Sequence, residues 1–250
     1  MRYFIELSYN GEKYHGWQNQ PNAISVQEVI EKALSTVLRK DVSILGAGRT
    51  DAGVHAKQMF AHVDVEEEIN RTELVFKLNS FLPQDIAIQD IHAVKEDAHA
   101  RFDAIGRTYE YWIVTEKNPF HNQSAHLVYK DLDVDLMNEA AKELFNYEDF
   151  KCFSKTHTDV KTYFCTIETV CWEQRNELLV FTIRADRFLR NMVRAIVGTL
   201  LEVGLGKLSI AGFKQIIESR NRNNAGTSVP GKALYLTAVT YPAETFKTHG

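Results

Sequence analysis

The chain contains 250 residues, of which 44% are hydrophobic and 25% are charged. This composition is typical of a globular protein that buries enough apolar surface to fold without disulfides or a structural metal. The chain has only five prolines and thirteen glycines and no segment of biased composition, which excludes disordered and collagen-like chains. The net charge of −4 argues mildly against a nucleic-acid partner, but the spacing of Arg184, Arg187, Arg190 and Arg194 predicts one basic face.

The cysteines, histidines and apolar stretches indicate the cellular compartment of the protein and whether it binds a metal. Cys152, Cys165 and Cys171 are odd in number and form no C-x-x-C pair, which predicts reduced thiols in a cytoplasmic protein and no zinc site. His92, His99 and His157 show no metal-ligand spacing with these cysteines. The most apolar stretch, residues 192–205, contains Arg194 and Glu202, so we expect neither a membrane-spanning helix nor a signal peptide.

The first part of the chain mixes two periodicities. Residues 3–7 alternate as a strand that ends in an Asn-Gly turn pair, and residues 25–38 carry one apolar helical stripe with Ser25 as N-cap. We then expect a strand over 59–65, a helix over 71–81 that Pro83 stops, and a strand over 86–94.

The remaining chain repeats this mixture. We expect a strand over 108–115, a helix over 134–145, strands over 162–173 and 177–185, helices over 188–203 and 209–219, and a closing strand over 233–241. Strand pairs mixed with helices, without strict βαβ alternation, favour an α+β fold with a mixed, mainly antiparallel sheet. We place two similar subdomains at 1–104 and 105–250, around a central cleft that is the default position for a site.

Residues 46–56, GAGRTDAGVHA, hold the densest cluster of special residues in the chain. Three glycines allow positive φ and close backbone approach, and Arg49, Asp51 and His55 add three ionisable groups. The plain alternative is a tight surface turn with solvated charges, because glycine and aspartate commonly mark turns.

Two phosphate-binding patterns do not fit this loop. A dinucleotide fingerprint fails because Asp51 stands where its third glycine belongs, and no Gly-Lys-Ser/Thr follows for a phosphate loop. A solitary aspartate flanked by arginine remains. Such a carboxylate suits a nucleophile or base kept ionised by a cation, a role that carboxylates play in covalent catalysis on sugars.

At residues 48–56, GRTDAGVHA resembles the signature of the TruA family of tRNA pseudouridine synthases. Other motifs resemble that family in the expected order: GWQ at 16–18, RF at 101–102, RTYEY at 107–111, FLRNMVR at 188–194, and ALYL at 233–236 followed by Tyr241-Pro242. Together they span nearly the whole chain.

The resemblance implies a pseudouridine synthase fold and assigns roles to five residues. Asp51 resembles the essential aspartate, and Tyr109 resembles the tyrosine that packs on the flipped target base. Arg194 resembles the basic residue that pairs with the aspartate across the cleft, Arg49 is expected to contact the RNA backbone or a displaced base, and Leu234 resembles the aliphatic residue that lines the uracil pocket. For Tyr109 the alternative is a half-buried strand tyrosine, and for Arg184, Arg187 and Arg190 it is a solvated face.

The implied reaction isomerises uridine to pseudouridine at positions 38, 39 and 40 in the anticodon stem and loop of tRNA. The N-glycosidic bond breaks, the base rotates and C5 joins C1′, so no cofactor is needed. Whether the aspartate attacks C1′, removes the 2′ proton or adds to the base stays open. The resemblance also implies a homodimer whose tRNA touches both chains.

Two positions depart from the family pattern, and the role of His55 is considered with them. A serine-phenylalanine-arginine stretch is frequent where this chain has CFSK at 152–155, so Lys155 moves the charge by one position. Ala233 stands where glycine is frequent, which tightens the expected pocket around Leu234. We expect His55 to be structural rather than an acid or base, because the residues after Asp51 run into a strand.

Two other classes of function remain as alternatives. A non-catalytic RNA-binding or folding factor keeps the basic helix and Tyr109 but does not need Asp51. A sugar-processing hydrolase uses two carboxylates that flank the bond, and only Asp51 has a convincing setting.

Overall fold

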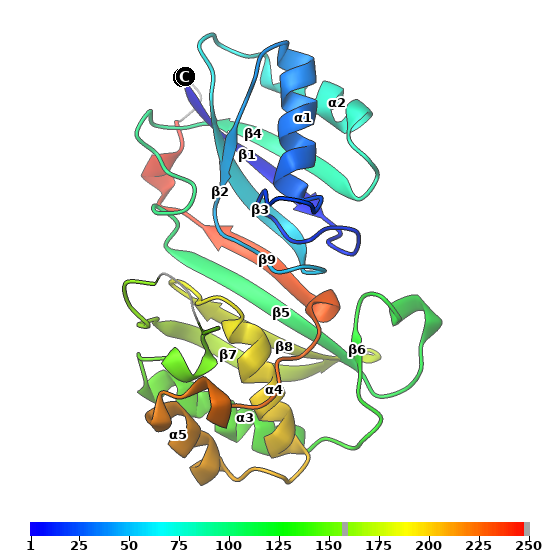
Figure 1. Cartoon of the computed structure of the whole chain (residues 1–250), viewed down its shortest axis with the longest axis vertical. Coiled ribbons are helices and arrows are strands. Elements are labelled where there is room, and N and C mark those ends of the chain that lie inside the picture. The colour runs from blue at the N-terminus through cyan, green and yellow to red at the C-terminus, as the bar shows by residue number, and fades with distance from the viewer. Residues whose placement is uncertain (157–159, 248–250) are drawn as a thin grey trace. The chain divides into compact units, whose positions relative to one another are not determined.

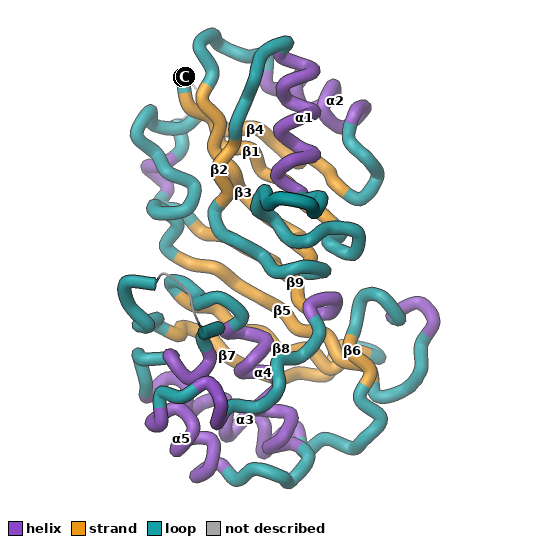
Figure 2. Tube along the Cα trace, viewed as in Figure 1, coloured by secondary structure: helices purple, strands orange, loops and turns teal. Residues whose placement is uncertain are grey.

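The computed structural model describes residues 1–156 and 160–247, so His157 lies outside the described residues. The chain divides into two compact units, of which the first comprises Met1–Gly106 and Leu236–Gly250 and the second comprises Arg107–Tyr235. Figure 1 labels the elements, and Figure 2 colours helices, strands and loops.

The first unit is a mainly antiparallel sheet with two helices. Its elements are β1 (Arg2–Tyr9), α1 (Val26–Leu38), β2 (Ile44–Gly46), β3 (His55–Asp64), α2 (Arg71–Phe81), β4 (Ile86–Ala93), most of β9 (Leu234–Thr240) and a short 3₁₀ turn at Ala243–Thr245. The strands lie in the order β4-β1-β3-β9, and β2 pairs with β3. The pairs β1–β3, β1–β4 and β2–β3 are all antiparallel.

Both faces of this sheet are covered. Figure 1 shows α1 and α2 on one side of it, and α1 buries Ile30 and Leu34 completely. On β1, Phe4 is fully buried, and its ring centroid lies 5.1 Å from that of Tyr241 and 6.1 Å from that of Phe246. Aromatic burial of this kind stabilises a fold strongly, which explains why the chain after β9 belongs to the first unit.

The second unit combines three antiparallel strands with three helices. Its elements are β5 (Gly106–Val114), β6 (His126–Leu127), α3 (Val134–Lys142), β7 (Ile167–Arg175), β8 (Leu178–Ala185), α4 (Met192–Gly204) and α5 (Ile210–Ser219). The order is β5-β8-β7 with antiparallel pairing, and β6 runs parallel to β5. Short 3₁₀ turns occur at Pro119–His121, Glu143–Asn146, Lys151–Phe153, Arg222–Asn224 and Gly231–Ala233.

The α+β prediction with a mainly antiparallel sheet is confirmed. Several predicted bounds are also close: α2 spans the expected residues, and Ser25 caps α1 by accepting a hydrogen bond from Glu28 N at 3.1 Å. The division of the chain differs from the prediction of 1–104 and 105–250. The stretch that begins at Leu236 belongs to the first unit, because β9 lies beside β3 and its continuation packs on Phe4.

Other predicted bounds need correction. The helix expected over 188–203 begins only at Met192, because Asn191 takes a left-handed conformation with φ of 67°. The helix expected over 134–145 changes to 3₁₀ geometry after Lys142. The strand expected over 162–173 begins at Ile167. The short strands β2 and β6 were not expected.

Candidate active site

Asp51 lies in the loop that joins β2 to β3, one of the segments drawn in teal in Figure 2. Its side chain is half-buried, whereas Arg49 and Ala52 are exposed. Within the loop, Val54 N donates a hydrogen bond to Asp51 O at 3.2 Å. The loop therefore presents one carboxylate and one guanidinium near solvent, on a backbone that turns back on itself.

The glycines of this loop serve different purposes. Gly53 has φ of +76°, a conformation that L side chains rarely adopt. A Cβ on Gly46 would lie 2.4 Å from Nε1 of Trp17, so the absence of a side chain there admits the indole of the GWQ motif. A Cβ on Gly48 would meet nothing within 4 Å, so close approach does not require that glycine.

The chain after β1 supports the loop from one side. Trp17 N donates to Thr50 O at 3.3 Å, and Gly53 N donates to Tyr14 O at 3.2 Å. His55, at the start of β3, is 3% exposed, and its Nδ1 accepts a hydrogen bond from Gly11 N at 3.1 Å. This bond fits the structural role that the sequence predicts for His55, since Nδ1 is turned toward the backbone and accepts a hydrogen bond there.

Tyr109 lies in the middle of β5 in the second unit. It stands opposite Ile183 of β8 and is half-buried. Its ring meets the ring of Phe188 edge to face, with centroids 5.1 Å apart and an interplanar angle of 88°. This edge-to-face contact fixes the orientation of the Tyr109 ring.

Arg194 lies in the first turn of α4, where no acidic residue is present. Its Nε donates to Val229 O at 2.7 Å, and Val229 N donates to Arg194 O at 3.2 Å. The helix dipole favours anions rather than cations in a first turn. Helix stability therefore does not account for an arginine here, and its guanidinium is instead held by the carbonyl of Val229.

Tyr111 connects the strand of Tyr109 to the segment that holds Arg194. Because side chains alternate along a strand, Tyr109 and Tyr111 lie on the same face of β5. The hydroxyl of Tyr111 donates to Pro230 O at 3.1 Å, next to the carbonyl that Arg194 contacts. Burial raises the pKa of Tyr111, and the charge of Arg194 opposes that rise.

Leu234 begins β9, directly after the 3₁₀ turn Gly231–Ala233. Its side chain is 6% exposed, and Ala233 is fully buried. The methyl group of Ala233 is thus accommodated in the packing beside Leu234. Leu234 follows Pro230 by four residues, and Tyr109, Arg194 and Leu234 all belong to the second unit.

The other predicted cations have different surroundings. Arg184 forms an ion pair with Glu168 at 2.6 Å on neighbouring strands, which supports the plain interpretation for that residue. Arg187 is half-buried and Arg190 is exposed. Lys155 is exposed, and its backbone N–H donates to Arg190 O at 3.0 Å.

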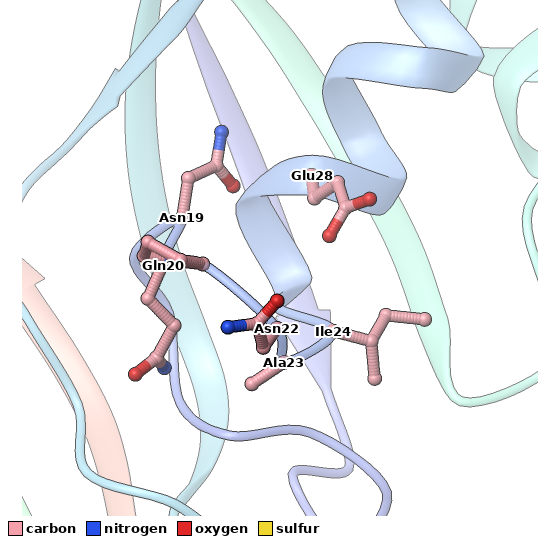
Figure 3. Close-up of a pocket in the computed structure, with 7 residues that line it drawn as sticks. Asn19, Gln20, Asn22, Ala23, Ile24 and Glu28 are labelled. Atoms are coloured by element: carbon pink, nitrogen blue, oxygen red, sulfur yellow. The ribbon is translucent and has the colours of Figure 1, made fainter.

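A surface pocket lies at the loop before α1 (Figure 3), with a volume of about 620 Å³. Its lining is Asn19, Gln20, Pro21, Asn22, Ala23, Ile24 and Glu28. Arg49, Asp51, Tyr109, Arg194 and Leu234, all of which the structure describes, are absent from this lining. Glu28 is the one titratable member and pairs with Lys32 at 2.5 Å, so we assign the pocket no catalytic role.

Within the described ranges, 1–156 and 160–247, no group of three or more His, Cys, Asp and Glu side chains has the arrangement of a metal site. No described helix is long and apolar enough to cross a membrane. Cys152 and Cys165 are buried free thiols, and burial raises the pKa of each to about 12.

Comparison with known proteins gives a family and several relatives. The family model described as tRNA pseudouridine synthase matches residues 7–103 and 140–242. A protein named tRNA pseudouridine synthase A from Bacteroides fragilis is 59% identical and covers 98% of both chains. Proteins of the same name from Bacteroides thetaiotaomicron and Acetivibrio thermocellus are 58% and 40% identical, covering 98% and 94% of this chain and 92% and 97% of their own.

Proposed function

The chain belongs to the tRNA pseudouridine synthases, a family of isomerases that act on tRNA, and on that premise we propose that it modifies uridines 38, 39 and 40 of the anticodon stem and loop. In the reaction the bond between C1′ and N1 breaks and a bond between C1′ and C5 forms. The proton on C5 leaves and N1 gains one, so the isomerisation needs no co-reactant.

The observation that carries the proposal is the setting of Asp51. One half-buried carboxylate stands in a loop whose backbone is hydrogen-bonded on both sides of it, through Thr50 O and Gly53 N. Catalysis depends on holding a reacting group in a fixed geometry. We therefore assign Asp51 as the catalytic residue.

The other roles follow from what each side chain offers. Tyr109 supplies a π face for the flipped base, and stacking of this kind is worth about 1–3 kcal/mol per base. Leu234 supplies an apolar wall for the uracil ring. Arg49 supplies a guanidinium group for the RNA backbone or a displaced base, which arginine contacts with paired donors. Arg194 keeps the role that the resemblance implies, that of the cation for the catalytic aspartate.

The anticodon position is tested with unmodified tRNA transcripts that carry uridine at one of 38, 39 and 40 and cytidine at the other two. Pseudouridine is mapped along each transcript after incubation. We expect modification at the single uridine in each case, and modification confined to other positions would overturn the assignment. Release of free uracil would instead indicate a hydrolase, and tRNA binding without any product would indicate a non-catalytic RNA-binding factor.

We also propose that the protein acts as a cytoplasmic homodimer. The free thiols of Cys152, Cys165 and Cys171 suit a reducing compartment. Sedimentation of the purified protein with and without tRNA tests the dimer, and a mass of one chain at micromolar concentration would contradict it.

A further inference from the structure

Thr50, the residue directly before Asp51, is held through both its side chain and its carbonyl. Its Oγ1 lies 2.9 Å from the hydroxyl oxygen of Tyr9 and shares a hydrogen bond with it. Its carbonyl accepts the bond from Trp17 N described above. Neither Tyr9 nor Thr50 has a role in the reaction as proposed so far.

Tyr9 reaches the loop because of an irregularity in the sheet. It is the last residue of β1, and the register with β3 shifts between Leu7 and Tyr9, where Tyr9 pairs with Ala56. Such bulges re-aim a side chain and often occur beside active sites. Tyr9 is 4% exposed, so its hydroxyl needs a hydrogen-bond partner inside the protein.

The packing around this bond leaves the loop little freedom. Gly16 has φ of +93°, and a Cβ on it would lie 2.2 Å from Thr50 O. The rings of Tyr9 and Trp17 lie with centroids 6.2 Å apart, and Trp17 occupies the space beside Gly46. The backbone therefore approaches Thr50 as closely as a glycine allows, and two aromatic rings fill the remaining space.

We propose that Tyr9 and Thr50 are positioning residues for Asp51. This inference rests on the proposed function: the bond between their hydroxyls fixes the loop so that the carboxylate meets the uridine in its reactive geometry. Displacing a catalytic group by about 1 Å costs about a hundredfold in rate. Loss of one neutral hydrogen bond corresponds to about tenfold at most, so we expect the single-turnover rate on saturating tRNA to fall by about tenfold.

The test removes each hydroxyl without removing bulk. Tyr9→Phe and Thr50→Val are measured singly and together in single-turnover reactions on saturating tRNA. The matched control is Tyr3→Phe, since Tyr3 lies on the same strand, is also 4% exposed, and donates its hydroxyl to Met1 Sδ, remote from the loop. We expect each single variant to lose about tenfold, the double variant to lose no more, Thr50→Ser to retain the rate, and Tyr3→Phe to match wild type.

A second measurement does not depend on activity. The amide of Gly53 donates to Tyr14 O and that of Val54 to Asp51 O, and hydrogen exchange reports the opening of such bonds. We expect these two amides to exchange about tenfold faster in Tyr9→Phe than in Tyr3→Phe.

The outcomes separate the positioning role from the proposed function. Wild-type rate and wild-type exchange in Tyr9→Phe would overturn the positioning role, as would a double variant that multiplies the two single losses. A lowered melting temperature with an unchanged rate would make the bond merely structural and overturn the role as well. Absence of product from wild type, with faster exchange in Tyr9→Phe, would defeat the proposed function and leave the loop contact standing.

Discussion

Replacing Gly198 by alanine tests how tightly α4 is pressed against the segment that carries Val229. Gly198 lies inside α4, one helical turn after Arg194. A Cβ on it would lie 1.9 Å from Thr227 O and 3.0 Å from Thr227 C, both backbone atoms. An ordinary contact begins near 3.4 Å, so the helix and the segment would have to separate by about 1.5 Å.

Two effects of opposite sign decide the size of the change. Alanine in a helix interior is favoured over glycine by about 1 kcal/mol. Overpacking against backbone costs about 1–3 kcal/mol or more, and a clash that no side-chain rotation relieves belongs at the upper end. The expected net loss is about 2 kcal/mol in the free energy of unfolding, which lowers Tm by about 4–8 °C for a chain of this size.

The assay is thermal melting followed by far-ultraviolet circular dichroism. Gly48→Ala is the matched control, since a Cβ there meets nothing within 4 Å, and its stability is expected to stay within about 0.5 kcal/mol of wild type. If Gly198→Ala melts at or above the wild-type temperature, α4 is not in the close contact with Thr227 from which we argue.

Two further predictions concern salt and pH. Despite the net charge of −4, the affinity for tRNA should fall more than about tenfold between 50 and 200 mM salt, because the protein's cationic side chains displace counterions from the tRNA phosphates. A flat response in filter binding would mean that the arginines face solvent. Burial lowers the pKa of His62 to about 4, so the folded state binds fewer protons than the unfolded state between that value and about 6.5. Stability should therefore fall by about 2 kcal/mol from pH 7 to pH 5 through this group, and urea unfolding of His62→Gln should show a smaller fall; an equal fall in both proteins would exclude His62 as the cause.

Local signals in the sequence were sufficient for many elements. The helix α2 has the expected bounds because Asn70 caps it, by accepting from Glu73 N at 3.1 Å, and Pro83 follows its end. These features act within a few residues, so the sequence displays them directly. The same holds for the residues of the Asp51 loop, whose composition alone marks it as special.

Conformations that depend on distant packing were not predictable. The left-handed Asn191 delays the start of α4, and nothing in the neighbouring sequence requires it. The strand β2 has three residues, Ile44–Gly46, too few to show alternation. The sequence predicts that the loop glycines provide positive φ or close approach, and this is correct for Gly53 and Gly46. It is wrong for Gly48, where a Cβ would meet nothing within 4 Å, and only the structure shows what each Cβ would meet.

The contacts between distant residues in the candidate site could not be predicted from the sequence. The bond between Tyr9 and Thr50 joins residues 41 positions apart, and that between Arg194 and Val229 joins residues 35 apart. No periodicity relates such pairs. The register shift near the end of β1 and the close contact of Gly198 with Thr227 accompany these bonds, and both depend on the folded chain.

The central claim is that Asp51 carries out an isomerisation on tRNA. The measurement is the amount of pseudouridine formed in unmodified tRNA, labelled in its uridines and digested to nucleotides after incubation with wild type or with Asp51→Asn. We predict stoichiometric product without free uracil from wild type, and no product from Asp51→Asn, whose affinity for tRNA stays within about tenfold because phosphate contacts dominate binding. Pseudouridine formation by Asp51→Asn would contradict the account.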